Sequence, residues 1–163
     1  MKLGNVLILN LLLALVWVAL QGAGGPSEFL TGLIAGFILL ALLHREYGRR
    51  VVEATRFVIF LLWSIVKSSI DVAVLILSPH PNLDQGIVAI PLDATTDFEV
   101  AILATSITLT PGTLSVDVGH NAAGQRVLYV HNLVTGDPEA MRRDIKQQFE
   151  QRILRFTRSS EEK

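Results

Sequence analysis

Lys67 and Asp71 are the residues best placed for chemistry at membrane depth, because they stand four positions apart in a long apolar segment. With Ser64 and Ser68 they follow the i, i+3, i+4, i+7 spacing that gathers side chains on one helix face. Ionisable residues in such segments are candidate ion or proton sites. They also serve as structural pairs that anchor helix depth or a neighbouring subunit. The structural interpretation is favoured, because one Lys–Asp pair does not make a continuous proton path.

A second distinctive group is residues 106–114, with the sequence SITLTPGTL. Thr108, Thr110 and Thr113 alternate around Pro111 and Gly112, where a predicted helix meets a predicted strand. Threonine hydroxyls can bond to the carbonyls that are freed at a helix end, and glycine can take the positive φ of a chain reversal. The pattern therefore predicts a structural and docking element, not a catalytic or ion-binding site.

Other chemistry finds little support in the sequence. The four histidines show no metal-ligand spacing on a helix, and the absence of cysteine excludes disulfides, thiolate metal sites and thiol catalysis. The chain has no phosphate-binding loop and no dinucleotide fingerprint. A net charge of −1 without a basic-aromatic patch gives no sign of nucleic-acid binding. We expect a protein that is not an enzyme, with no metal, no cofactor and no nucleic-acid partner.

The elements that position these residues begin with a strongly apolar stretch. Residues 3–43 contain no Lys or Arg, and Glu28 is their only charged residue. Two apolar runs, residues 6–20 and 29–43, flank a Gly-rich turn at residues 22–27. With its flanks the first run reaches about 20 helical residues, enough for the hydrocarbon core of a bilayer. This pattern predicts a transmembrane helical hairpin.

Small residues in the second run suggest how the hairpin packs. Gly32 and Gly36 are four positions apart, a spacing that lets two helix backbones approach closely in lipid. A cleaved signal peptide is the alternative for the first run, since Lys2 precedes a leucine-rich stretch and small residues surround Ala23. The second apolar run that follows directly favours the hairpin.

Charge asymmetry predicts the topology. Four arginines lie just after the second run: Arg45, Arg49, Arg50 and Arg56. The hairpin turn at residues 22–28 has no arginine. The positive-inside rule then places a basic loop at residues 44–56 in the cytoplasm and the turn outside. Residues 1–56 thus form a predicted hairpin plus a cytoplasmic loop.

The third apolar segment, residues 57–78, fits two structures. It could span the bilayer, with its polar stripe facing a partner protein and Lys67 paired with Asp71. It could also lie flat in the cytoplasmic interface, with the stripe toward water. A charged residue at the bilayer centre costs roughly 2.5–3.5 kcal/mol, which so apolar a segment can offset. Energy alone therefore leaves both structures open.

The remaining residues predict a small soluble domain at 79–158 and a disordered tail at 159–163. Thr96 and Glu99 match a capping box that opens a helix, and Pro138 suits the first turn of a second helix. The predicted order is β-α-β-β-α, a three-stranded open sandwich with helices on one face. Its strands are expected at residues 86–92, 113–118 and 126–131.

Three segments together resemble a known family. They are ITLTPGTL at residues 107–114, LYVH at residues 128–131, and the pattern of Ile145, Lys146, Phe149 and Glu150. In this order, after short membrane helices, they resemble the E subunit of Mrp-type (Mnh-type) multisubunit Na⁺/H⁺ antiporters. The resemblance covers nearly the whole chain, and the octapeptide is its specific part.

The resemblance implies a role in a bacterial inner membrane. Such complexes exchange cytoplasmic Na⁺ or other monovalent cations for external H⁺, and their large subunits carry the proton paths. The E subunit is a small partner that supports assembly and activity, so other antiporter subunits and membrane lipid are the implied partners. The resemblance also implies a cytoplasmic domain, which favours the interfacial structure for residues 57–78. A stand-alone, membrane-anchored binding or regulatory domain is the alternative function.

Overall fold

The computed structural model describes residues 3–22, 24–79 and 83–158. The chain forms two compact units, one through Val52 and one from Glu53 to Arg158. Helices and strands follow in this order: α1 (Leu3–Gln21), α2 (Pro26–Leu43), α3 (Arg45–Leu77), β1 (Gly86–Pro91), α4 (Asp97–Leu109), β2 (Thr113–His120), β3 (Arg126–Asn132), α5 (Pro138–Asp144), the π-helical η1 (Ile145–Glu150) and α6 (Gln151–Thr157).

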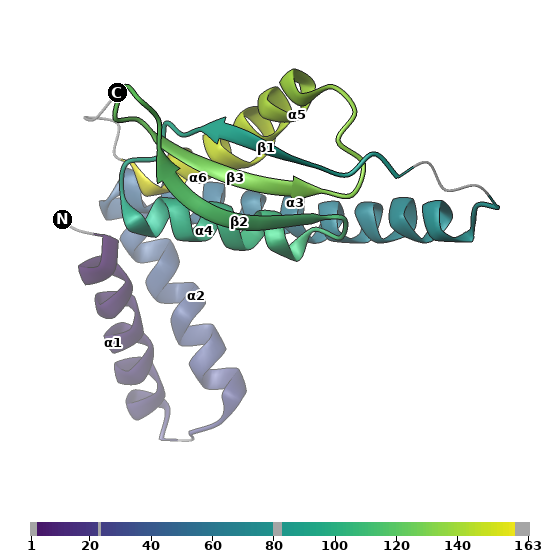
Figure 1. Cartoon of the computed structure of the whole chain (residues 1–163). Helices are drawn as coiled ribbons and strands as arrows, with labels where there is room; N and C mark the ends of the chain where they lie inside the picture. The colour runs from purple at the N-terminus through teal and green to yellow at the C-terminus, as the bar shows by residue number, and fades with distance from the viewer. Residues whose placement is uncertain (1–2, 23, 80–82, 159–163) are drawn as a thin grey trace. The chain divides into compact units, whose positions relative to one another are not determined.

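The N-terminal unit is a hairpin of α1 and α2 (Figure 1). Pro26 occupies the first turn of α2, where its missing N–H costs no hydrogen bond. A small cluster of Val6, Leu40 and Tyr47 forms the interior of this unit. Most other apolar side chains of the two helices stay exposed, as expected for helices that face lipid rather than a protein core.

The segment expected as a basic loop at residues 44–56 differs from its prediction. From Arg45 onward it is helical, and it continues without a break into the third apolar segment. Ion pairs one turn apart support this start, with Glu46 near Arg49 at 3.0 Å and Glu53 near Arg56 at 2.9 Å. Arginine is also a good helix former, so the cluster of arginines at residues 45–56 is compatible with a helix as well as with a loop.

The second unit contains the predicted three-stranded sheet. Its order is β1-β3-β2, and both pairings are antiparallel, so β3 lies in the centre (Figure 1). An irregularity between Ser115 and Asp117 shifts the register of β2. The unit thus has the small α+β fold that the sequence predicts.

The helices pack against one face of this sheet because its inward residues are apolar. Val88 and Val130 are opposite each other on β1 and β3, and both are buried in the core with Leu103 of α4 and Ile153 of α6. The preceding residue of β1, Ile87, is 61% exposed on the opposite face. This alternation follows the two-residue period of a strand with one covered face.

The final helix departs from the continuous α-helix that was expected. Residues Ile145–Glu150 form a π-helical segment between α5 and α6. The wider turn accompanies full burial of Glu150, whose side chain is 1% exposed. Such π segments often occur where a helix must place one side chain out of its regular register.

Candidate functional site

The junction between α4 and β2 is built as its sequence predicts. Thr110 is the C-cap of α4, and its backbone N–H donates to the Ile107 carbonyl. Gly112 has a φ of +91°, the left-handed region in which glycine meets no steric cost. The chain then enters β2 at Thr113, so two residues suffice to reverse its direction.

The threonine hydroxyls of this turn are used inside it. The Thr110 hydroxyl donates to the Ser106 carbonyl at 3.0 Å, and the Thr113 hydroxyl donates to the Ile107 carbonyl at 2.6 Å. Thr108 accepts a bond at 3.1 Å from the backbone N–H of Ser115. The Thr110 and Thr113 hydroxyls thereby satisfy open carbonyls at the end of α4, and the Thr108 hydroxyl accepts a backbone N–H of β2. The turn is a rigid connection, and these three bonds account for its distinctive composition.

Helix α3 packs against the same domain through its middle part, beginning at Phe57. Phe57 is 5% exposed and belongs to the core, and its ring centroid lies 5.7 Å from that of Phe156. One turn later Phe60 meets Phe149 edge-on at 5.3 Å. The guanidinium of Arg152 covers the Phe60 ring at 4.2 Å from its centroid, a cation–π contact. These rings tie α3 to α6 and η1.

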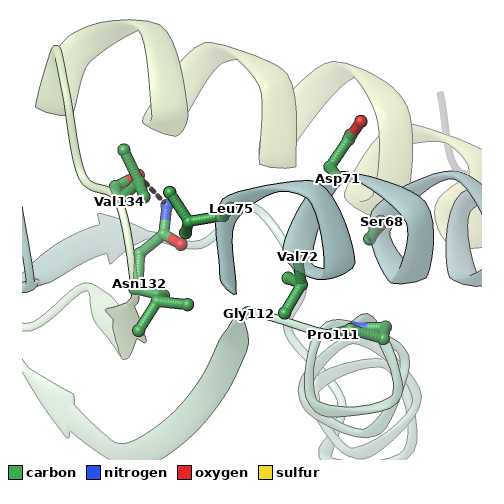
Figure 2. Close-up of a pocket in the computed structure, with 9 residues that line it drawn as sticks. Ser68, Asp71, Val72, Leu75, Pro111, Gly112, Asn132 and Val134 are labelled. Carbon is green, nitrogen blue, oxygen red and sulfur yellow. Dashed lines mark hydrogen bonds between the residues drawn. The ribbon is translucent and has the colours of Figure 1, made fainter. Parts of the chain in front are cut away.

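Farther along, α3 meets the turn and the end of β3 around a cleft of about 330 Å³. Its walls are residues 68–75 of α3, the Pro111–Gly112 turn and residues 132–134. Figure 2 shows Val72 pointing toward Gly112 and Asp71 pointing away from the turn. A Cβ atom added to Gly112 would come within 3.3 Å of the Val72 side chain. The turn and the helix are therefore close neighbours.

The rest of the α3 surface in this unit is uncovered and mostly apolar. Lys67 and Asp71 are both exposed, and no ion pair joins them. On the side opposite the domain lies a continuous strip that we call the apolar row. It consists of Val58, Ile59, Leu62, Trp63, Val66, Ile70, Val74 and Leu77, each more than half exposed.

In the N-terminal unit, Gly32 and Gly36 lie at the contact between α2 and α1. A Cβ at Gly32 would be 3.0 Å from the Ala14 backbone, and one at Gly36 would clash with the Asn10 side-chain oxygen. Asn10 is 8% exposed and donates to the Tyr47 hydroxyl at 3.2 Å. The Asn10 side-chain oxygen, which has no hydrogen-bond partner among the described residues, therefore occupies the space that a side chain at position 36 would need.

Two buried glutamates were not singled out as functional from the sequence. Burial tends to raise the pKa of Glu99, but hydrogen bonds from Thr157, Thr96, Arg158 and Thr95 lower it to about 2. The carboxylate thus serves as a shared acceptor for two backbone amides and two side chains. Its contact with Thr96 is the predicted capping box, while its partners from α6 come from nearly sixty positions away in the chain.

Glu150 has the opposite electrostatics. One carboxyl oxygen accepts the backbone N–H groups of Asp93 at 2.6 Å and Ala94 at 2.9 Å, and the other oxygen has no hydrogen-bond partner among the described residues. Burial raises the pKa of this group despite the bonds from Ala94 and Asp93. The side chain clamps the loop between β1 and α4 onto η1, which explains why the π segment places it inward.

Comparison with known families decides the assignment. The family model described as "MNHE: Na+/H+ ion antiporter subunit" matches residues 10–156, most of the chain. The chain belongs to the MNHE family. Among its relatives is the E subunit of the Na⁺/H⁺ antiporter of Alkalihalophilus pseudofirmus, which is 35% identical over 93% of this chain and 98% of its own length. The corresponding subunit of Bacillus subtilis is 29% identical over the same shares.

Solved structures give the same relation for this MNHE-family chain. A chain of the Mrp complex from a Dietzia species is 28% identical, with a TM-score of 0.51 over 65% of this chain and 96% of that chain. A chain of the membrane-bound sulfane sulfur reductase, an archaeal respiratory membrane complex, is 26% identical, with a TM-score of 0.52 over 91% of this chain and 96% of that chain. Members of this fold therefore occur in two kinds of membrane complex.

In its described residues, the MNHE-family chain has two helices long and apolar enough to cross a membrane, Pro26–Leu43 and Arg45–Leu77, and a shorter apolar helix at Val6–Gln21. Across residues 3–22, 24–79 and 83–158, no group of three or more His, Asp or Glu side chains could hold a metal ion. The features that stand out in the described chain are thus contacts and surfaces for packing: the helix hairpin, the Pro111–Gly112 turn, the cleft and the apolar row.

Proposed function

We propose that the chain is an accessory subunit of a multisubunit cation/proton antiporter, and that it supports assembly and activity while other subunits carry the main ion path. Membership of the MNHE family and relatives named as E subunits of Na⁺/H⁺ antiporters support the assignment. The accessory role rests on charge. Glu28 is the only charged residue between positions 3 and 43, so the hairpin offers no chain of ionisable groups along which protons or cations could move.

The observation that carries the proposal is the two-sided packing of α3. Between Phe57 and Leu75, about 27 Å of helix, one side contacts the α+β domain and the other exposes the apolar row. The domain bears surface ion pairs such as Arg126 with Asp97 and Lys146 with Asp93. If α3 crossed the bilayer, this polar surface would lie in hydrocarbon at a large desolvation cost.

We therefore place α3 in the cytoplasmic interface of a bacterial inner membrane, with the apolar row in the lipid and the domain in the cytoplasm. The α1–α2 hairpin spans the bilayer with its turn outside. Lys67 and Asp71 then lie near the headgroups rather than in the membrane interior, so neither needs a partner to offset burial. The Pro111–Gly112 turn becomes a structural and docking element on the cytoplasmic side.

The accessory role predicts that the chain alone does not exchange ions. Purified full-length chain in proteoliposomes should give no Na⁺-driven pH change, measured with a trapped pH-sensitive dye, above empty vesicles. The complete complex, isolated by gentle solubilisation through a tag on this chain, should give exchange in the same assay. Robust exchange by the chain alone would refute the proposal, and isolation as a monodisperse single protein would favour a stand-alone regulatory domain.

The topology predicts opposite accessibility for two engineered cysteines, in a chain that has none of its own. Ala122→Cys lies in the exposed β2–β3 loop, and Ser27→Cys lies in the exposed first turn of α2, next to the α1–α2 connection. An impermeant thiol reagent added to intact spheroplasts should label Ser27→Cys at once and Ala122→Cys only after lysis. Labelling of Ala122→Cys from outside would instead show that α3 spans the membrane.

A further inference from the structure

Strand β2 forms one edge of the sheet and exposes apolar, strand-forming side chains. Within the described chain only β3 pairs with it, so one side of its backbone faces away from the sheet (Figure 1). Leu114, Val116 and Val118 are each more than 40% exposed. An apolar edge of eight residues is a template for pairing with another chain. A second copy of β2 suits it well, because two identical antiparallel edges are self-complementary.

Backbone N–H groups on this free edge are occupied inside the chain. Ser115 donates its N–H to the Thr108 hydroxyl at 3.1 Å, and Val118 donates its N–H to one carboxylate oxygen of Asp117 at 2.8 Å. The N–H of Thr113, at the start of the strand, donates within the α4–β2 turn. Because these groups bond outside the β2–β3 ladder, they are the donors that an added strand would need.

The spacing of the three donors follows from the irregularity of β2. Thr113 and Ser115 are two positions apart, as expected for groups on one edge of a strand. The register shift between Ser115 and Asp117 adds one residue, so the same edge continues at Val118. The shift also brings the charged, exposed Asp117 next to the free edge. Bulges and charged side chains are both features by which natural sheets oppose pairing at their edges.

The other edge of the sheet, on β1, is closed by different means. The Arg142 guanidinium of α5 donates through Nε to the Ala89 carbonyl at 2.8 Å. Pro91, at the end of β1, has no N–H to offer. Side chains therefore occupy or remove backbone hydrogen-bonding groups at both edges of this small sheet.

We propose that the Thr108 hydroxyl and the Asp117 carboxylate close the free edge of β2 against strand addition by a second copy of the chain. Thr108 thereby differs from Thr110 and Thr113, whose hydroxyls donate to carbonyls of α4. Without the two acceptors, each copy presents two open N–H groups to the outward carbonyls of its partner. The inference depends on the sheet edge alone and not on the proposed membrane position of α3.

The test compares self-association of full-length chains in detergent micelles, measured by sedimentation velocity over a range of concentrations. Thr108→Val combined with Asp117→Ala removes both acceptors. It should raise the dimer association constant about tenfold or more above the native value, because each pair gains four N–H donors that form hydrogen bonds between the copies. The matched control combines Thr108→Ser with Asp117→Asn, which loses the same charge but keeps a side-chain acceptor at both positions. It should associate like the native chain.

Engineered residues locate the contact, in a chain without cysteine of its own. In the variant without acceptors, Val116→Cys should give disulfide-linked dimers under mild oxidation, whereas Ser27→Cys, in the membrane hairpin, should give few. Adding Val118→Pro removes one of the opened N–H groups at an edge position, where proline is tolerated. It should bring the association constant back toward the native value.

A variant without acceptors that keeps both the native circular dichroism spectrum and the native association constant overturns the inference. Stronger linking through Ser27→Cys than through Val116→Cys also overturns it, because the copies would then meet at the hairpin. If the combined variant loses its native spectrum, Thr108→Val alone is compared with Thr108→Ser, and the same two outcomes decide.

Discussion

At the scale of single residues, the α+β domain contains two buried glutamates whose pKa values are shifted in opposite directions. Glu99 accepts hydrogen bonds from four groups, which lower its pKa to about 2. One oxygen of Glu150 finds no hydrogen-bond partner in the described part of the chain, and burial raises the pKa of this group. The number of donors around each carboxyl decides the sign, since both side chains are almost fully buried. Protonation of Glu99 at low pH should therefore lower the free energy of unfolding of the domain.

Removing one donor from Glu99 should shift this acid sensitivity. Because the folded pKa is depressed, the stabilisation is complete above the ordinary value of 4.5 and is lost as pH falls toward 2. Thr157→Val removes the hydroxyl that donates at 2.8 Å, so it should cost about 1–3 kcal/mol at neutral pH. Because the folded pKa of Glu99 is then less depressed, the further loss of stability below pH 4.5 should be smaller than in the native chain.

Thermal unfolding of the full chain in nanodiscs, followed by circular dichroism from pH 7 to pH 3, measures both effects. Thr95→Val is the control, because Thr95 contributes its backbone N–H to Glu99 and keeps it after the substitution. Identical pH profiles for the two variants would contradict the assigned role of the Thr157 hydroxyl.

The Pro111–Gly112 turn gives a second prediction at this scale. Gly112→Val forces a β-branched residue to a φ of +91°, which costs on the order of 1–3 kcal/mol, and its Cβ would press on Val72. Thr110→Ser keeps the hydroxyl bond to the Ser106 carbonyl and should be nearly silent. Complex yield and antiport rate should fall together in Gly112→Val. A fully assembled complex without exchange, or with altered ion preference, would place the turn in the transport mechanism.

At the scale of elements, the hairpin depends on how closely α2 approaches α1. The Ala14 backbone leaves no room for a side chain at position 32, so Gly32→Ile should force the helices apart and cost about 1–3 kcal/mol. Gly24→Ala is the control, because its Cβ would meet nothing nearer than 3.8 Å. Unfolding in mixed detergent micelles should show a lower midpoint for Gly32→Ile alone. Equal midpoints would mean that the hairpin packs differently in the membrane.

The elements that the sequence predicted well are those with local causes. Thr96 and Glu99 define a helix start within four residues, and Gly112 defines a reversal through its own φ. The start of α3 was expected to be a loop because its arginines suggested a membrane flank, whereas their pairing with Glu46 and Glu53 supports helix. The π segment escaped prediction because its cause, burial of Glu150 against Asp93 and Ala94, lies more than fifty positions away.

At the scale of the whole molecule, the described chain divides into a membrane hairpin and a domain that shares α3 with it, with the boundary after Val52. The turn residues of the candidate site could be singled out from sequence, because proline, glycine and threonine have strong local preferences. The cleft could not, because it joins residues 68–75 to residues 132–134. The periodicity of α3 indicated its polar stripe but not which protein surface the stripe would meet.

The presence of Phe57 and Phe60 at the domain interior has a consequence for biosynthesis. These residues leave the ribosome before any strand of the sheet has been made, since chains are synthesised from the N-terminus at about 5–20 residues per second. Until the sheet arrives, α3 has two apolar sides, and only the bilayer is available to cover one of them. In the proposed interfacial arrangement, the nascent domain then folds against a helix already held at the membrane surface. A fragment that starts after α3 would lack part of its core, so we expect it to aggregate when it is expressed alone.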